Sequence, residues 1–278
     1  MSEARTYPHG VPCWIDTVAH DLDATTAFYG QLFGWSFTDA MPPEAPGNYL
    51  IATVDGQDVA AIASPDFADE PVTWRTYIAV DDADAAARGV IAAGGSVTLD
   101  PVDAGPGGRQ AVCRDPRGAE FRLWQARRRL GAQRVNDPNT WNFSDLHTSD
   151  PAGATNFYGP LFGWEFDELG FATLIRRPGY GDHLAATVDA GIRERQADVE
   201  APPGFADAIA WLATDAPDRD VWQVSFTVAD RDASADSVRA LGGTVIATED
   251  TGWTKTASIR DPAGGLLVLS QFTPPSSG

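Results

Sequence analysis

The sequence predicts an α+β protein made of two tandem copies of one domain, each copy a pair of βαβββ modules. Two observations predict it. First, "AFYGQLFGW" (27–35) has a near copy in "NFYGPLFGW" (156–164), and "RDPRGAEFRLWQ" (114–125) has one in "RDPAGGLLVLSQ" (260–271). Second, each copy contains twice a short apolar strand ending at an Asp, a helix closed by Gly, and several strands, at a spacing of about 60 residues. The chain is therefore predicted to be a duplication.

The first repeated phrase is predicted to be a helix. Asp21 is placed to cap its first turn, and Gly34 follows its last turn, where a left-handed residue commonly ends a helix. The apolar residues between them recur at spacings of three and four, so we expect them to form the buried face. They are Ala24, Ala27, Phe28 and Leu32.

The second module of each copy repeats this order. In "YIAVDDADAAARGVIAAGGSV" (77–97) the strand is followed by Asp82 or Asp84 as the helix cap and by two glycines, 94–95, as the stop. Its counterpart in the second copy is "SFTVADRDASADSVRALGGTV" (225–245). Each copy then ends in a strand that follows D-P-x-G.

The duplication predicts three parts of the chain: an N-terminal domain over 1–127, a linker over 128–140 and a C-terminal domain over 141–278. The second copy also carries an acidic, Pro-containing insertion over roughly 187–221 that the first copy lacks. We expect this insertion to be a lid, or to supply "AIAWLA" (208–213) as an extra edge strand.

The composition predicts a globular, cytoplasmic protein. Hydrophobic residues make up 43% and charged residues 21% of the 278, and no stretch has the roughly 20 apolar residues of a membrane span. The formal net charge of -19 argues against binding nucleic acid or an anionic membrane, because both need a basic surface. Two cysteines and a start without an apolar run of signal-peptide length predict reduced thiols.

The repeated motifs resemble one superfamily. The pattern D-x-x-A-x-x-F-Y-x-x-L-F-G-W after a strand, with D-P-x-G before a last strand, resembles the vicinal oxygen chelate superfamily, which includes glyoxalase I, extradiol dioxygenases, fosfomycin-modifying enzymes and bleomycin-binding proteins. "PGYGDHL" (178–184) and "RERQADVEAPPGFADAIAWL" (193–212) further resemble two-domain glyoxalase-like proteins of antibiotic-producing bacteria. The resemblance implies glyoxalase-like domains with cup-shaped sheets around a ligand cavity, and it does not imply one reaction.

The resemblance also implies where a metal would bind. Enzymes of the superfamily hold a divalent ion with His and Glu side chains at three positions of each cup. Here those positions carry Trp14, Arg75 and Arg122 in the first copy and Phe143, Gln223 and Val268 in the second. Zinc and hard divalent ions need imidazole or carboxylate ligands. We therefore expect the metal site to be erased in both copies, with no cofactor.

In the first copy, strand alternation puts Trp14, Asp16 and Val18 on one face, which the resemblance makes the cavity face. Arg75 and Arg122 would lie opposite and neutralise Asp16. This network would either plug the cavity as a buried ion pair in place of a lost metal or bind a ligand. The residues expected to bind ligand here are Trp14, Asp16, Tyr49, Arg75, Tyr77, Arg122 and Trp124.

The second cavity is expected to be more open, with apolar walls and a few hydrogen-bonding groups, a lining that suits an organic ligand. The residues expected to bind ligand are Phe143, Asp145, His147, Tyr180, His183, Gln223, Ser225, Val268 and Ser270. Asp145 would share a face with His147 and orient its imidazole for acid–base work, or His147 is structural. His183 lies in a Gly-containing segment between strands, which either approaches a ligand or is an ordinary turn.

Two functions fit these residues. In the first, the chain binds a small organic, aromatic and possibly cationic ligand without a metal, for drug sequestration in antibiotic biosynthesis or self-resistance. In the second it is an enzyme, either a metal-free isomerase or cyclase using Asp145, His147 or His183, or a glyoxalase, lyase or dioxygenase. We favour binding, by a monomer or homodimer, because the metal ligands are lost while nine tryptophans and strong acidity remain. The sequence leaves open whether modules pair within a copy or across copies.

Overall fold

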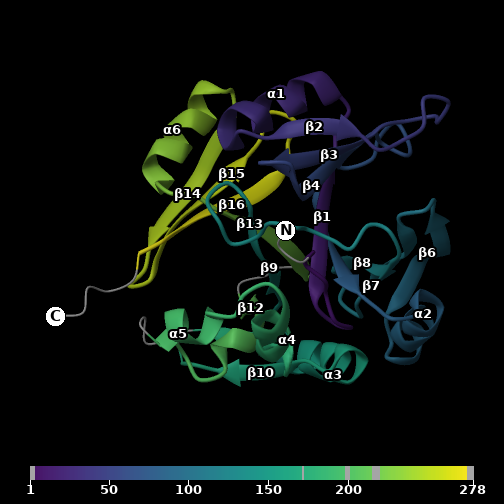
Figure 1. Ribbon diagram of the computed structural model, residues 1–278, viewed down its shortest axis with the longest axis vertical. Helices are drawn as coiled ribbons and strands as arrows, with labels where there is room; N and C mark the ends of the chain where they lie inside the picture. Colours follow the sequence, from purple (N-terminus) through teal and green to yellow (C-terminus); the bar gives the residue numbers. More distant parts are fainter. Residues whose placement is uncertain (1–3, 171, 198–200, 215–219, 274–278) are drawn as a thin grey trace. The chain divides into compact units, whose positions relative to one another are not determined.

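A computed structural model describes residues 4–170, 172–197, 201–214 and 220–273, and it contains the four predicted modules in chain order (Figure 1). The first module is β1 (Pro12–Val18), α1 (Leu22–Phe33), β2 (Ser36–Asp39), β3 (Tyr49–Val54) and β4 (Gln57–Ala63). The second is β5 (Trp74–Ala79), α2 (Ala83–Ala92), β6 (Ser96–Ala104), β7 (Gly108–Arg114) and β8 (Glu120–Ala126).

The second copy has the same order with additional helices. Its first module is β9 (Trp141–His147), α3 (Pro151–Phe162), β10 (Glu165–Glu168), β11 (Thr173–Arg176) and, after α4 (Tyr180–Thr187), α5 (Ile192–Ala197) and the short 3-10 helix η1 (Phe205–Asp207), β12 (Ala208–Ala213). Its second module is β13 (Val221–Thr227), α6 (Arg231–Ala240), β14 (Thr244–Asp250), β15 (Thr254–Arg260) and β16 (Leu266–Phe272).

The strands of each copy form one eight-stranded sheet, which confirms the predicted α+β fold with two tandem domains. The strand order is β2-β3-β4-β1-β5-β8-β7-β6 in the first copy and β10-β11-β12-β9-β13-β16-β15-β14 in the second. Within each module the first and last strands are parallel and the outer pairs are antiparallel. Neither sheet closes on itself, since the order leaves two edge strands in each.

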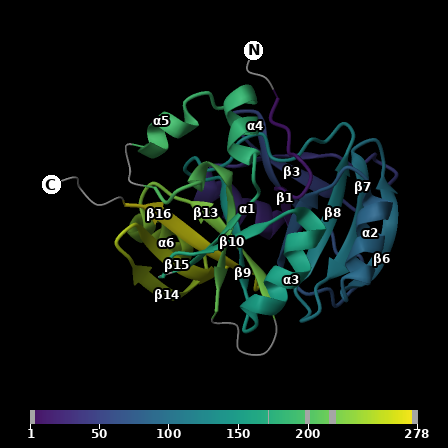
Figure 2. The same cartoon turned by 90° about the horizontal axis from the view of Figure 1, so that it is seen from below.

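The chain packs into two compact units, and each unit contains parts of both copies. Unit I consists of Met1–Trp14, Thr76–Gly131 and Ser144–Trp222, and unit II consists of Ile15–Arg75, Ala132–Phe143 and Gln223–Gly278. Figure 2 shows α2 beside β6, β7 and β8 in unit I, and α6 beside β14, β15 and β16 in unit II. In unit I the apolar face of α2 joins that of α3 in one buried core, which includes Val90, Phe121 and Phe157.

The repeated F-Y and D-P-x-G motifs meet inside the compact units. In unit I the hydroxyl of Tyr158 on α3 donates to the Asp115 carboxylate at 3.0 Å, and it accepts from the indole Nε1 of Trp222 at 3.1 Å. Desolvation raises the pKa of Tyr158, and it also raises that of Asp115. Tyr158 is therefore a neutral donor that satisfies a carboxylate taken out of water.

Unit II contains the same arrangement. Tyr29 on α1 donates to Asp261 at 2.7 Å and accepts from Trp74 Nε1 at 3.1 Å. Burial is again the main cause of the raised pKa of the tyrosine. In each unit the Tyr of the duplicated F-Y motif donates a buried hydrogen bond to the Asp of a duplicated D-P-x-G motif. The repeated motifs are therefore structural scaffold.

Aspartate caps start the principal helix of every module. Asp21, Asp82, Asp150 and Asp230 each accept a hydrogen bond from the backbone N–H three residues later, at 2.9 to 3.0 Å. Asp82 is therefore the cap of α2, and Asp84 instead accepts two bonds from the Arg109 guanidinium. Gly34 ends α1 with φ of 70°, as predicted.

The predicted buried face of α1 is wrong by about one residue. Phe28 is buried as expected, but Ala24 and Ala27 are exposed, and the other buried residues are Thr25, Tyr29 and Phe33. Aromatic rings remove far more apolar area from water than alanines do, so they decide which stripe faces the core. Tyr29 joins that stripe because its hydroxyl finds partners there.

The insertion of the second copy differs from the prediction in its strand, and the predicted lid stays a prediction. "AIAWLA" is β12, an inner strand that pairs with both β9 and β11, so it is not an extra edge strand. The added residues instead form α4, α5 and η1 before β12, and of the predicted insertion 198–200 and 215–219 lie outside the described residues. An apolar strand of this kind is stable where both of its edges and faces are covered.

Across the described residues, no helix combines the length and the apolar character that crossing a membrane requires.

Candidate functional site

A buried polar cluster occupies the predicted site of the first copy, within unit II. Arg75 Nε donates to Asp16 at 2.6 Å, and its Nη1 donates to Glu70 at 3.2 Å. Tyr49 on β3 donates to the second oxygen of Asp16 at 3.0 Å. It reaches across β4, where Ala61 lies in register with Asp16 and leaves room because its side chain is small.

This cluster is closed to water. Asp16 has no exposed surface and Arg75 is 8% exposed, and all seven residues of β1 are buried. The predicted pairing of Asp16 with Arg75 is present. Glu70 was missed because it lies in an acidic loop without periodicity, and its Oε2 accepts the backbone N–H of Asp66 at 2.7 Å.

Three of the remaining first-copy residues, Tyr77, Arg122 and Trp124, form a second cluster within unit I, and Trp14 is buried on β1. Arg122 on β8 lies beside Tyr77 on β5, donates to its hydroxyl at 3.3 Å and places its guanidinium carbon 5.5 Å from the ring centre. Trp124 meets the same Tyr77 ring edge-on at 6.2 Å. The cation and the two rings thus hold one another in place, a contact that strengthens when it is removed from water.

In the second copy, β9 alternates as a strand with one open face. Ser144 and Leu146 are buried, whereas Phe143, Asp145 and His147 between them are partly exposed. This contrasts with the fully buried β1. The predicted face is therefore the accessible one on this strand.

Asp145 has an unusual environment on that face. Its carboxylate accepts the backbone N–H of Trp211 on β12 at 3.0 Å. Burial raises its pKa to about 6, an effect that this hydrogen bond and the nearby His147 only partly offset. A carboxyl that titrates near neutral pH beside an imidazole can give or accept a proton.

The predicted residues on β13 and β16 belong to unit II. Ser225 on β13 lies in register with Val268 on β16, and Ser270 is in register with Thr227. Ser225 and Ser270 are buried, while Gln223 and Val268 are partly exposed. They offer one amide, two hydroxyls and an apolar surface.

His183 and Tyr180 do not lie in the ordinary turn that was one of the two alternatives for this segment, and its approach to a ligand stays a prediction. Both are in α4, whose rings stack at 6.3 Å, and His183 Nε2 lies 3.0 Å from the carbonyl and 3.1 Å from the hydroxyl of Thr6. Tyr180 is 8% exposed and belongs to the core of unit I. The glycines predicted a turn, but tertiary contact with the N-terminal segment stabilises a helix here.

The residues present do not fit the metal that the fold family implies. Within the described ranges, no group of three or more His, Cys, Asp and Glu side chains is arranged to hold an ion. Arg75 and Arg122 are permanently protonated and have no lone pair to donate. Asp16 accepts from Arg75 and Tyr49, so its oxygens are already engaged.

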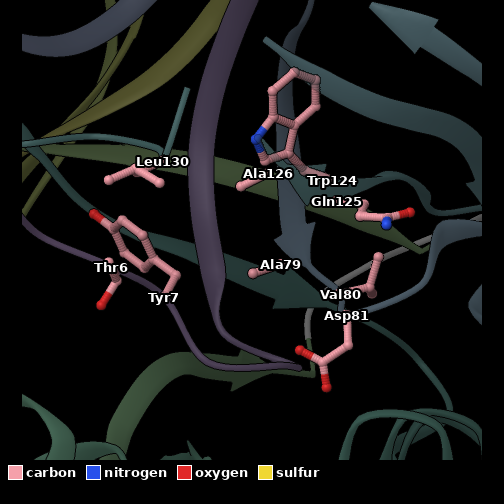
Figure 3. A pocket seen from close by; sticks show the side chains of 9 residues that line it. All are labelled: Thr6, Tyr7, Ala79, Val80, Asp81, Trp124, Gln125, Ala126 and Leu130. Atoms are coloured by element: carbon pink, nitrogen blue, oxygen red, sulfur yellow. The ribbon is translucent and has the colours of Figure 1, made fainter. Parts of the chain in front are cut away.

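One cavity of about 310 Å³ lies in unit I around Trp124 (Figure 3). Trp124 was predicted as a site residue, but the rest of the lining was not. Thr6, Tyr7 and Leu130 come from the N-terminal segment and the linker, which carry no motif, and the other lining residues lie at or just after the ends of β5 and β8. The lining residues are Thr6, Tyr7, Ala79, Val80, Asp81, Trp124, Gln125, Ala126 and Leu130.

Comparisons with known proteins agree with this architecture. Residues 14–123 match the Glyoxalase/Bleomycin resistance protein/Dioxygenase superfamily, and residues 143–269 match the Glyoxalase-like domain. The chain is 35% identical to "Putative glyoxylase CFP32" of Mycobacterium tuberculosis over 99% of both chains. It is 32% identical to the anthracycline biosynthesis protein DnrV of Streptomyces peucetius over 97% of both.

Its fold is similar to that of the Mn(II)-bound glyoxalase from Novosphingobium aromaticivorans. The TM-score is 0.58 at 16% identity, and the match covers 98% of this chain and 83% of that chain.

Proposed function

Since the chain belongs to the Glyoxalase/Bleomycin resistance protein/Dioxygenase superfamily, we propose that it is a metal-independent binding protein that sequesters an aromatic natural product, in antibiotic biosynthesis or self-resistance. The observation that carries the proposal is the Arg75 guanidinium, bound to Asp16 and Glu70 at a position where the superfamily resemblance implies a metal ligand. The Arg75 guanidinium of the protein itself, and not a bound metal ion, neutralises the carboxylates of Asp16 and Glu70.

Two further observations support an aromatic ligand, and a third supports a positive charge on it. Phe143 is partly exposed on β9, as are the polar Asp145 and His147 that follow it on the same face, which suits a ring with hydrogen-bonding substituents. A relative that matches over 97% of both sequences carries a name from anthracycline biosynthesis. The net charge of -19 favours a cationic over an anionic ligand.

The test is a calorimetric titration of the protein with an anthracycline, before and after treatment with a chelator. We expect saturable binding whose affinity is the same in both preparations. Phe143→Ala should weaken binding by roughly tenfold or more, the effect of losing a buried aromatic contact. The matched control is Phe272→Ala, which removes an exposed phenylalanine from β16 of the same copy.

Absence of binding at millimolar ligand would end the proposal. So would elemental analysis that finds one tightly bound metal per chain, together with loss of binding on its removal.

Asp145 favours a second candidate function, a metal-free enzyme that moves protons on a carbonyl-containing ligand. Its pKa of about 6 and its position beside His147 are the observations in favour. The test is incubation of candidate ketones in deuterated water, with mass spectrometry of the ligand. Asp145→Asn should abolish catalysed exchange without changing ligand affinity, and exchange equal to that of the unmodified protein would exclude Asp145 as the base.

A further inference from the structure

The cavity around Trp124 is built from a region that lies mostly outside the matched family domains. Thr6 and Tyr7 precede the matched residues 14–123, and Trp124 to Leu130 follow them. Only Ala79, Val80 and Asp81 of its lining fall inside the match. The cavity therefore lies where the N-terminal segment and the linker meet the ends of β5 and β8.

The Trp124 wall is held rigidly. The indole Nε1 of Trp124 donates to the backbone carbonyl of Arg129 in the linker at 2.9 Å, and this hydrogen bond fixes the orientation of the ring. The backbone N–H groups of Arg127 and Arg129 both donate to the Gly107 carbonyl at 3.0 Å. Gly108 lets the strand approach the ring, since a Cβ there would lie 2.7 Å from Trp124. A wall fixed before binding reduces the entropy lost when a ligand binds.

The opposite wall is fixed by the N-terminal segment. Gly10 N–H donates to the Ala79 carbonyl at 2.8 Å, which aligns this segment with β5. Tyr7 packs against Gly131, where a Cβ would lie 2.8 Å from the ring. Figure 3 shows Tyr7 and Leu130 on one side of the cavity, Trp124 on the other, and Asp81 at its lower end.

Asp81 is the one ionisable acid or base among the cavity's lining side chains, apart from the tyrosine. Its side chain is 89% exposed, and the Nδ1 of His9, which accepts the backbone N–H of Asp81, lies 4.0 Å from its carboxylate. The neighbouring Asp84 pairs with Arg109, and Arg127, which follows β8, pairs with Asp103. The mouth of the cavity thus carries a carboxylate without a strong ion pair to a guanidinium in the described contacts.

We propose that this cavity binds a small planar aromatic amine, with its ring against Trp124 and its ammonium group near Asp81. Cavities that take small molecules span roughly 300–1,000 Å³, so this one is at the lower limit and suits one or two fused rings. An indole or a quinoline bearing an alkylamine has the required shape and charge. This proposal is independent of the proposed function. Of the residues that line the cavity, only Trp124 is also among the residues predicted to bind ligand in the cups.

The test uses tryptamine as the probe and indole-3-acetate as a comparator with the same ring and the opposite charge. Binding is measured by calorimetry and by saturation-transfer NMR. We expect tryptamine to bind more tightly than indole-3-acetate. Asp81→Asn should weaken tryptamine binding by about threefold, as befits an exposed charge, and should not weaken indole-3-acetate binding.

Trp124→Leu should weaken both probes by about tenfold or more, because stacking on the indole is lost. The matched control is Trp253→Leu, which removes a partly exposed tryptophan that stacks on Phe272 in unit II. If Trp124→Leu loses its native circular dichroism spectrum, Leu130→Ala in the linker tests the same cavity and should weaken binding several-fold.

Three results would overturn the inference: no saturable tryptamine binding at millimolar concentration, equal affinity for the two probes, or unchanged affinity in both cavity variants. Phe143→Ala separates this site from the proposed cup. It should leave tryptamine binding unchanged, whereas it should weaken anthracycline binding.

Discussion

Arg75→Met is expected to destabilise the protein by about 3–5 kcal/mol, because it leaves a buried carboxylate without its cation. Asp16 has no exposed surface and receives Arg75 Nε at 2.6 Å, so water cannot replace the lost donor. The methionine keeps the unbranched apolar stem of the arginine and lacks only its guanidinium end. The lost free energy therefore reports the charge rather than a cavity.

A double-mutant cycle separates the interaction from its parts. Asp16→Leu with Arg75→Met removes both charges and is expected to cost much less than Arg75→Met alone, because no unpaired ion remains. Glu70→Gln is the control, since Glu70 keeps 12% of its side chain exposed and accepts Arg75 at a longer 3.2 Å. It should cost about 1 kcal/mol or less.

The measurement is urea unfolding followed by circular dichroism, with the midpoint compared at an unchanged slope. If Arg75→Met lowers the free energy of unfolding by less than about 1 kcal/mol, or if the double variant is as unstable as the sum of the single variants, the buried pair is not what this cluster depends on.

Three further predictions concern the rest of the chain. Tyr158→Phe and Tyr29→Phe should each lower the free energy of unfolding by about 1–3 kcal/mol in urea melts, because each leaves a buried aspartate short of a donor; variants as stable as the parent would contradict this. Burial raises the folded-state pKa of Asp145 to about 6, so this group stabilises at low pH and its contribution is lost as the pH rises from about 4 through 6. Asp145→Asn should remove that slope from a plot of urea midpoint against pH, and an unchanged slope would assign it to other groups. Burial raises the pKa of Cys113 to about 12 and that of Cys13 further, so neither thiol should react with a disulfide reagent at pH 8 until urea unfolds the chain.

The fold could be predicted from the sequence because its signals are local. Asp21 and Asp82 act through a backbone N–H only three residues away. Gly34 acts through its own backbone angle. Strand alternation, which has a fixed period of two, placed Asp16 on the face where it meets Arg75. None of these inferences requires knowledge of distant parts of the chain.

The errors occurred where distant segments decide. The "GYGDHL" segment has the composition of a turn, yet His183 binds Thr6, which lies far earlier in the sequence, and the segment is helical. Tyr29 faces the core because Asp261 is there to accept a hydrogen bond from its hydroxyl. The cavity at Trp124 needs Tyr7 on one side and Leu130 on the other, and neither residue carries a signal of its own.

The mixed composition of the compact units has a consequence for synthesis on the ribosome. Unit II needs residues 15–75 and also residues after 223, so it cannot be completed until almost the entire chain has been translated. Tyr29 would leave the ribosome long before its partner Asp261 is synthesised. The aromatic residues on the buried face of α1 would stay exposed to solvent until then. A chain truncated after the first copy should therefore be prone to aggregation and depend on chaperones. Its sequence is one whole repeat, but it lacks the second-copy segments that complete each compact unit.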